Sequence, residues 1–318
     1  MKKKILLFIS ILCFVSVNTN AETVEFFPWG NFDKWTVRYI KESSLLGGDT
    51  VSLYCIGPVD TIRKNEPYVY GKQGCPWATS NVYASPAGID KGSCTVVPEK
   101  RGNGYAAKML SVLEKVKAIG FINKTVQASG SVFTGQMIEP VKDTKEPYTK
   151  MNLGVPFVKR PDYLQFDYKC VISNENTYTY ASSSGSSETK TGHDEGQIYL
   201  FLQNRWEDAN GNVYCKRVGT ASYRFNKSTE AWVNNFRIPV RYGDITKQPD
   251  FKPYEGLQTT IYVKNSKGKM VQLQETGYDA EAKPTHIIIF ISVGSLPAYN
   301  GHVGNVLCVD NIKMVYNQ

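Results

Sequence analysis

The sequence lacks the motifs that mark several large enzyme classes. Its three histidines, His193, His286 and His302, do not fall at the spacing of zinc ligands. No Gly-x-Ser-x-Gly elbow is present, which argues against a serine hydrolase of that type. Gly102-Asn103-Gly104 lacks the third glycine of a dinucleotide-binding fingerprint and is interpreted as a turn. The sequence therefore predicts no zinc, serine or dinucleotide chemistry.

Long apolar runs are also scarce, and the one present lies at the start of the chain. Residues 1–4 are cationic, residues 5–17 are apolar, and Thr19-Asn20-Ala21 offers small residues for cleavage. Together they predict a signal peptide over residues 1–21. The apolar run is shorter than the roughly 20 residues of a membrane-spanning helix. We therefore expect an exported chain that begins near Glu22, lies in the periplasm or at the cell surface, and has no transmembrane segment after cleavage.

A strong charge of one sign is missing as well. The formal charge is +8, but three of the positive charges are Lys2, Lys3 and Lys4 in the predicted leader. The other lysines and arginines are scattered among acids, without the basic stripe or aromatic platform of a nucleic-acid binder. Nucleic acid is therefore excluded as an expected partner.

No two cysteines have CxxC spacing, but export would permit disulfides. Six cysteines follow the leader: Cys55, Cys75, Cys94, Cys170, Cys215 and Cys308. Six thiols allow many pairings, and the sequence does not select among them. A disulfide would help most in the loop-rich first third, which holds Cys55, Cys75 and Cys94. Cys170 and Cys308 lie in strand-like runs, where we expect buried free thiols.

What the sequence does contain is typical of an all-β protein. Aromatic residues make up 12% of the chain, and 26 glycines and 15 prolines punctuate short segments. The clearest strand covers residues 164–172, where Leu164, Phe166 and Tyr168 share one face. We predict a jelly-roll-like antiparallel β-sandwich with long loops, formed as a single domain by residues 22–318.

Further strands are predicted along the second half of the chain. Residues 197–203 and 221–225 flank an Asn-Gly turn, which predicts a hairpin. Residues 232–241 alternate in polarity, but Pro239 places that strand at an edge or a bulge. Residues 287–293 read as a buried strand and residues 305–316 as the last one.

Two segments are less clear. Residues 106–120 suit either a helix or a strand. The Ser-rich and Thr-rich residues 177–193 are expected to form a long flexible loop.

Two acids stand near the ends of the predicted domain. Asp33 lies in Asn31-Phe32-Asp33-Lys34-Trp35, and Asp310 lies in the last predicted strand. Secreted jelly-roll modules commonly open with a Phe-acid-Trp strand beside an Asp-bearing closing strand, so the two carboxylates could bind one structural Ca²⁺. The competing interpretation is that Asp33 caps a turn and Asp310 binds a loop amide.

Three segments resemble one known family. Residues 152–161, Asn-Leu-Gly-Val-Pro-Phe-Val-Lys-Arg-Pro, are similar to the G-x-PF-x-x-RP signature of the putative carbohydrate metabolism domain. Residues 76–81 resemble its W-x-T-x-N element, and residues 301–316 resemble its closing strand. The resemblance implies a jelly-roll fold similar to sugar-binding modules, and an exported glycan-handling protein of glycan-degrading Gram-negative anaerobes. It assigns no catalytic residue.

Tryptophans are the candidate sugar-binding side chains, because a flat indole can stack on the C–H face of a pyranose. Trp206 is the best placed, at a strand end beside Arg205, and Trp77 and Trp232 are the other candidates. The competing interpretation places each tryptophan in the core of the sandwich.

Acids in loops are the candidates for hydrolysis. A glycosidase needs two carboxyls about 5 to 9.5 Å apart, and Asp194, Glu195, Glu207 and Asp208 lie in suitable segments. The competing interpretation is that they lie on solvated turns, since no motif determines their separation.

The sequence as a whole favours an exported, non-catalytic carbohydrate-binding β-sandwich. Its expected partners are a glycan and other glycan-utilisation proteins. One alternative is a glycoside hydrolase-like enzyme that uses a loop carboxylate pair. A second alternative is a structural or adhesive surface protein without a sugar site.

Overall fold

The computed structural model describes residues 21–118, 122–143, 145–181 and 186–317. These residues form β-strands joined by turns and by short 3-10 helices: η1 (Ser44–Leu46), η2 (Lys72–Gly74), η3 (Pro86–Gly88), η4 (Pro147–Lys150) and η5 (Pro253–Glu255). The described residues include no helix with the length and apolar character needed to span a membrane. The predicted signal peptide lies outside the described residues except for Ala21.

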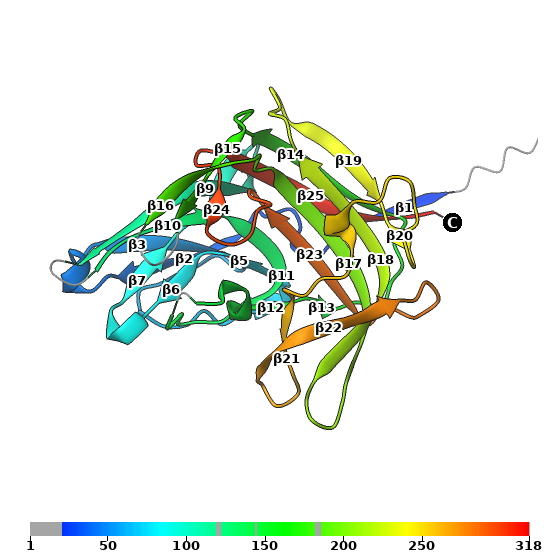
Figure 1. Ribbon diagram of the computed structural model, residues 1–318, viewed down its shortest axis with the longest axis horizontal. Coiled ribbons are helices and arrows are strands. Elements are labelled where there is room, and N and C mark those ends of the chain that lie inside the picture. The colour runs from blue at the N-terminus through cyan, green and yellow to red at the C-terminus, as the bar shows by residue number, and fades with distance from the viewer. Residues whose placement is uncertain (1–20, 119–121, 144, 182–185, 318) are drawn as a thin grey trace, which may run out of the picture.

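Two large sheets dominate the structure (Figure 1). The seven-stranded sheet has the order β10 (Ile122–Ser129), β9 (Gly104–Ala118), β25 (Val306–Asn317), β14 (Tyr163–Val171) and β19 (Val233–Pro239), with β1 (Glu22–Phe26) on β25 and β8 (Val96–Arg101) on β9. Its strand pairs are antiparallel.

The ten-stranded sheet has the order β12 (Met151–Leu153), β11 (Ser131–Met137), β23 (His286–Ser292), β17 (Gly196–Glu207), β18 (Val213–Phe225), β22 (Met270–Tyr278) and β21 (Tyr262–Lys264). Three short strands extend it: β5 (Trp77–Thr79), β13 (Val155–Pro156) and β20 (Arg241–Tyr242). In Figure 1, β17 and β18 run as a long pair across the molecule with β23 beside β17. Within this sheet the β18–β22 pair is parallel.

Three small sheets complete the fold. They contain β16 (Ser187–Thr191), β15 (Thr177–Ala181) and β24 (Asn300–Gly301); β3 (Thr50–Ile56), β2 (Trp35–Lys41) and β4 (Asp60–Ile62); and β6 (Val82–Ala84) with β7 (Lys91–Ser93).

The main core lies between the two large sheets. Alternate residues of β14, such as Leu164 and Phe166, meet alternate residues of β17 and β23, such as Leu200 and Ile289, and all four are fully buried. This period-two pattern is what a half-buried strand requires. The predicted all-β sandwich is confirmed.

The ten-stranded sheet is apolar on its outer face as well. Phe133, Phe201 and Ile288 belong to a second buried cluster, which β21, β22 and β12 help to cover. A sheet that is apolar on both faces can carry a lined pocket on its outer side.

The strand predictions for the second half of the chain are confirmed. Residues 164–172 correspond to β14, and the Asn-Gly turn joins β17 to β18 as a hairpin. Pro239 ends β19, which is the edge strand of its sheet. Residues 106–118, for which the sequence left helix and strand open, are a strand. They belong to β9, which pairs with β8, β10 and β25.

The long flexible loop predicted for residues 177–193 is wrong. Strands β15 and β16 form an antiparallel hairpin there, although residues 182–185 lie outside the described part. The cause is the alternation Thr177-Tyr178-Thr179-Tyr180, whose β-branched and aromatic residues favour strand over loop.

The expectation that the Phe-acid-Trp segment forms a strand beside the closing strand is also corrected. The N-terminal strand that pairs with β25 is β1, which precedes that segment. Residues 27–30 then follow β25 through the Phe27 amide on the Ile312 carbonyl and the Ile312 amide on the Gly30 carbonyl. Trp35 instead begins β2, which pairs with β3 and β4.

All six cysteines after the leader are free thiols. The expectation for Cys170 and Cys308 is confirmed, and no disulfide links Cys55, Cys75 and Cys94. Burial raises the pKa of Cys55 to about 12 and that of Cys308 to about 11. These thiols therefore stay protonated and are poor nucleophiles near neutral pH.

The two internal family-like segments hold the fold together. In residues 76–81, Trp77, Thr79 and Asn81 are at most 1% exposed. Trp77 Nε1 donates to the Pro28 carbonyl, Thr79 Oγ1 to the Tyr54 carbonyl, and Asn81 Nδ2 to the Tyr54 and Val96 carbonyls. This segment therefore joins separate parts of the chain.

Residues 154–161 form the passage from one large sheet to the other. Gly154 has φ +92°, and a Cβ there would lie 2.5 Å from Arg205 Nη2, so glycine fits a conformation and a space that other residues would not. Arg160 donates to the Ala280 and Ala282 carbonyls and lies over the Tyr242 ring. The signature thus has a structural role.

Candidate functional site

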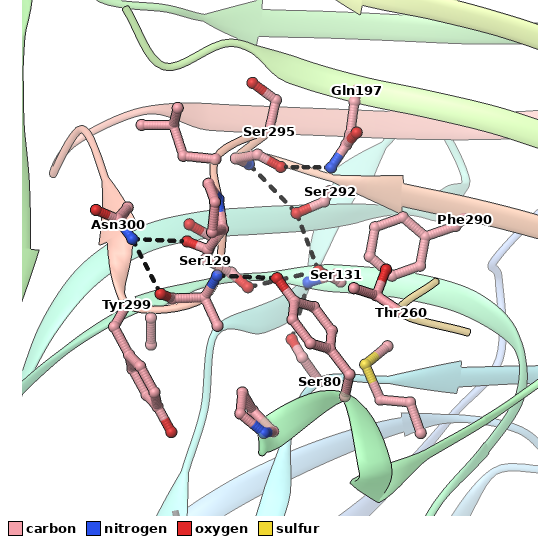
Figure 2. A pocket seen from close by; sticks show the side chains of 18 of the residues that line it. Ser80, Ser129, Ser131, Gln197, Thr260, Phe290, Ser292, Ser295, Tyr299 and Asn300 are labelled. Carbon is pink, nitrogen blue, oxygen red and sulfur yellow. Dashed lines mark hydrogen bonds between the residues drawn. The ribbon is translucent and has the colours of Figure 1, made fainter. Parts of the chain in front are cut away.

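A pocket of about 460 Å³ opens on the outer face of the ten-stranded sheet. Strands β11, β17, β18 and β23 supply its floor, and β10, η4 and the segments 254–261 and 294–300 supply its walls. Figure 2 shows how side chains from β11, β23 and the 294–300 segment converge on it. The pocket thus assembles residues from position 80 to position 300.

Stacked aromatic rings form part of the floor. Cross-strand register places Phe133, Phe290 and Tyr199 in one row over three neighbouring strands. The Phe290 and Tyr199 rings are 5.0 Å apart at 14°, and the Tyr199 and Phe201 rings are 4.4 Å apart at 19°. Tyr199 and Phe290 line the pocket. They add apolar aromatic groups to the lining, next to polar ones.

A row of hydroxyl and amide groups lies beside the aromatic row, because Ser131, Ser292 and Gln197 pair across the same three strands (Figure 2). The Ser131 amide N–H donates to Ser80 Oγ at 2.8 Å. Its own hydroxyl lies 3.0 Å from Ser292 Oγ. Gln197 Nε2 donates to the Gly294 carbonyl at 2.9 Å, which leaves its side-chain oxygen as an acceptor.

The 294–300 segment is held in place by side chains from other elements. The Ala298 amide donates to the Tyr148 hydroxyl at 2.9 Å. The Asp194 carboxylate accepts the amides of Ser295 and His302, each at 2.9 Å. Burial nevertheless raises the pKa of Asp194 above its usual value. This wall is therefore built before any ligand arrives.

Arg224 is the one charged side chain among the described lining residues, which include no Asp, Glu, Lys or His. Its guanidinium lies over the Tyr254 ring, 4.3 Å from the centroid. Burial lowers the pKa of Arg224 below its usual value. The pocket can therefore bind a polar or anionic molecule, but its described lining offers no carboxylate for general acid or base catalysis.

The three predicted tryptophans do not gather at this pocket. Trp77 is 1% exposed and packs edge-on against Phe27 and Phe32, so its face is not available to a sugar. The correction has a simple cause, because Trp77 fills the inter-sheet core. Trp232 is partly exposed and lies under the Arg101 guanidinium, at 4.0 Å.

Trp206 and Arg205 lie on opposite faces of β17. Trp206 is 43% exposed and stacks on Tyr214 at 5.8 Å. Arg205 is partly buried and donates to Gln203 Oε1 and to the Leu153 carbonyl. Burial lowers the pKa of Arg205 to about 10. The two neighbours in sequence therefore do not form one site.

Asp33 and Asp310 both contact the hairpin formed by β8 and β9, one through a backbone amide and the other through a side chain. Asp33 Oδ1 accepts the Tyr105 amide at 3.0 Å, and Asp310 Oδ2 lies 2.5 Å from Arg101 Nη1. Arg101 Nη1 also contacts Asp167 Oδ2 at 2.9 Å. The described residues contain no group of three or more His, Cys, Asp or Glu side chains placed to hold a metal. Arg101 therefore supplies a counter-charge to Asp310.

The acids considered for hydrolysis are separated by a whole strand. Asp194 and Glu195 precede β17, whereas Glu207 is its last residue and Asp208 follows it. At about 3.3 Å per residue, the length of β17 separates the two pairs by on the order of 40 Å. Both Glu207 oxygens bind Ser266. No pairing across β17 can meet the spacing of roughly 5 to 9.5 Å that a glycosidase needs.

Sequence reasoning missed Tyr199, Arg224, Tyr254 and Phe290. A signal was present in residues 197–203, where Tyr199 and Phe201 alternate with the core residues of the strand. Apolar residues on both faces of a strand indicate that its second face is also buried or used. The partner segments, however, come from distant parts of the chain.

Solved structures with partial similarity include two described as putative glycoside hydrolases. One, from Bacteroides vulgatus ATCC 8482, has 13% identity and a TM-score of 0.46, and the match covers 92% of this chain and 98% of that one. The other, from Bacteroides thetaiotaomicron VPI-5482, has 17% identity and a TM-score of 0.42, with coverage of 70% and 57%. The chain thus spans little more than half the length of the second structure.

A carbohydrate-binding module specific for non-crystalline cellulose has 11% identity and a TM-score of 0.27, with coverage of 80% and 95%. Similarity at these levels carries no inference about activity or ligand. No curated protein matches the chain. The family comparison is stronger, because residues 59–315 match one family over most of the chain. The chain belongs to the putative carbohydrate metabolism domain family.

Proposed function

We propose that this protein binds a glycan in the pocket on the outer face of the ten-stranded sheet, without cleaving it. The observation that carries the proposal is the lining: a row of aromatic rings beside hydroxyl and amide groups, in a concave space of about 460 Å³. Ligand pockets commonly measure about 300 to 1,000 Å³ and combine apolar walls with a few oriented polar groups. Membership of a carbohydrate-related family supports a sugar as the ligand.

Binding without hydrolysis is supported by the absence of carboxylates among the described lining residues. Two carboxyls at a defined separation are the usual requirement for glycoside cleavage. We further propose that the chain is exported to the periplasm or cell surface and acts with other glycan-utilisation proteins. The predicted signal peptide over residues 1–21 supports this part of the proposal.

Variants of two exposed aromatic residues can distinguish binding in the pocket from binding at the surface around Trp206 that the sequence predicted. Tyr254 lines the pocket and is 40% exposed, whereas Trp206 is 43% exposed and is not among the described lining residues. Because their exposure is similar, either change to alanine should affect stability little. We expect Tyr254→Ala to weaken retention by the bound polysaccharide at least fivefold in affinity electrophoresis, and Trp206→Ala to leave retention unchanged.

The reverse result would assign binding to Trp206 and its surroundings. If neither variant changes the retention seen for the unaltered protein, the site lies elsewhere. If the unaltered protein binds no member of a broad glycan panel, the binding proposal fails and a structural or adhesive role is favoured. Release of reducing ends from a bound glycan would contradict the non-catalytic part and favour the hydrolase alternative.

A further inference from the structure

Arg224 projects from β18 toward the pocket rather than toward the inter-sheet core. Its neighbours Tyr223 and Phe225 contact the main core, so alternation places Arg224 on the outer face. It pairs across the strands with Gln197, another lining residue. The side chain is partly buried, and its guanidinium lies 4.3 Å from the centroid of the Tyr254 ring.

The other partly or fully buried arginines of the described chain show what Arg224 lacks. Arg38 is paired with Glu139, Arg101 with Asp310, Arg217 with Glu275, and Arg241 with Glu255. Arg205 has no carboxylate partner, but it donates hydrogen bonds to Gln203 and Leu153.

Arg224 makes neither kind of contact within the described residues. No carboxylate oxygen comes within 4.0 Å of its guanidinium, and it donates no hydrogen bond. The acids that act on it electrostatically are Glu195 and Asp194, and the Asp194 oxygens already accept two backbone amides. The guanidinium thus keeps its five N–H donors available inside a pocket whose described lining has no negative charge.

A partly buried positive charge without a partner is unfavourable unless a ligand supplies the counter-charge. The planar fork of arginine matches the paired oxygens of a carboxylate or a sulfate. Contact with the Tyr254 ring restricts the guanidinium, which reduces the entropy lost when an anion binds. The unpartnered fork, the neutral lining and the stacking ring all point to an anionic ligand group.

We propose that Arg224 recognises the anionic group of an acidic sugar residue, so that the glycan bound in this pocket is a uronate-bearing or sulfated one. The inference rests on the proposed function, because it names the class of glycan that the same pocket takes. The carboxylate and the sulfate ester both offer paired anionic oxygens to the Arg224 guanidinium. Matched pairs of ligands distinguish the two groups.

The experiment compares each anionic glycan with its own neutralised form. Uronate oligosaccharides are paired with their carboxyl-reduced counterparts, and sulfated galactan oligosaccharides with their desulfated counterparts, by titration calorimetry. We expect the unaltered protein to bind one anionic form about tenfold more tightly than its neutral counterpart, as a charge-assisted bidentate contact would give. Arg224→Met should bring the ratio close to one while binding of the neutral form persists.

Arg63→Met is the matched control, because Arg63 is exposed and also stacks on a tyrosine, Tyr39, at 4.6 Å, but does not line the pocket. It removes the same charge and should leave the ratio unchanged. A ratio near one for the unaltered protein overturns the inference whatever the variants do. An affinity ratio in Arg224→Met equal to that of the unaltered protein also overturns the inference.

The two proposals fail in different ways. Binding of neutral and anionic glycans with equal affinity, still sensitive to Tyr254→Ala, would leave the proposed function intact and overturn only the role of Arg224. Binding of neither form would overturn both. A loss of preference in Arg63→Met equal to that in Arg224→Met would show a general effect of net charge and would also overturn the inference.

Discussion

His286, the first residue of β23, is kept neutral by its surroundings. Burial is the main cause and the nearby Arg205 guanidinium the second, and together they lower the pKa of His286 to about 4. Its Nδ1 lies 2.9 Å from Thr285 Oγ1. In the unfolded chain the same imidazole would titrate near its ordinary value of about 6.5.

This difference predicts a loss of stability in acid. As the pH falls below about 6.5, His286 becomes protonated in the unfolded state, whereas in the folded state it stays neutral until about pH 4. Protonation therefore favours the unfolded state. The contribution of His286 is complete above that range and is lost between pH 6.5 and 4. The shift in the pKa of His286 sets an upper limit of about 3 kcal/mol on this contribution to the free energy of unfolding. The actual value is smaller, because the side chain is partly exposed and solvent screens the effect.

We therefore expect the melting temperature of His286→Gln to fall less between pH 7 and pH 4.5 than that of the unaltered protein. The exposed His193→Gln serves as the control and should follow the unaltered protein. Parallel slopes for His286→Gln and the unaltered protein would show that His286 titrates normally in the folded state.

At the scale of elements, Arg101 joins three strands of the seven-stranded sheet. It ends β8, and its guanidinium reaches Asp167 on β14 and Asp310 on β25, two residues that face each other across those strands. Burial raises the pKa of Asp310. Burial opposes ionisation of Asp167 too, but hydrogen bonds from the Asn235 amide, Asn311 and Arg101 outweigh it and lower that pKa.

Removing Arg101 would leave two neighbouring buried carboxylates without a counter-charge. We expect Arg101→Met to lower the free energy of unfolding by roughly 2 to 4 kcal/mol, measured by urea denaturation at pH 7. Arg237→Met is the control, because the Arg237–Glu22 pair is exposed to solvent and its loss should change the free energy of unfolding much less. Equal effects of the two changes would contradict this role of Arg101.

The melting temperature of the unaltered protein, measured with and without a chelator, tests the predicted Ca²⁺ at Asp33 and Asp310. A lower melting temperature after chelation would support a cation, whereas an unchanged one would agree with Arg101 as the counter-charge. Until that measurement is made, the cation remains a prediction.

At the scale of the whole molecule, one core spans almost the entire chain. Its buried members run from Phe27 to Met314, and β1, which begins at Glu22, pairs with β25 at the other end. Loss of residues 1–21 would therefore leave this pairing intact.

If the chain is exported as proposed, the processed protein should have a defined mass and thiol count. We expect it to lack residues 1–21 by mass spectrometry, and to release six titratable thiols in denaturant without reductant, because Cys13 leaves with the leader and the other six are free. A retained Met1 would contradict export by cleavage. Fewer than six thiols in the processed protein would indicate a disulfide or an oxidised cysteine.

Most of the strands could be predicted from the sequence, whereas most of the pocket could not. Residues 164–172 and 287–293 show their strands through local alternation and apolar runs, which depend on nearby residues alone. The hairpin at residues 177–191 was missed because its serines and glycine hid the alternation of Thr177 to Tyr180. In the pocket, Trp206 was favoured over Tyr254 because tryptophan is the more conspicuous residue in a sequence.

The sequence by itself determined the all-β class, the order of the main strands and the family. These depend on periodicity and on short motifs, both of which are local. Only the tertiary structure decided that Trp77 is buried, that Arg101 holds Asp310, and that Arg224 enters a pocket without a partner. Burial and charge pairing depend on residues that are far apart in the chain and meet only when the two sheets close.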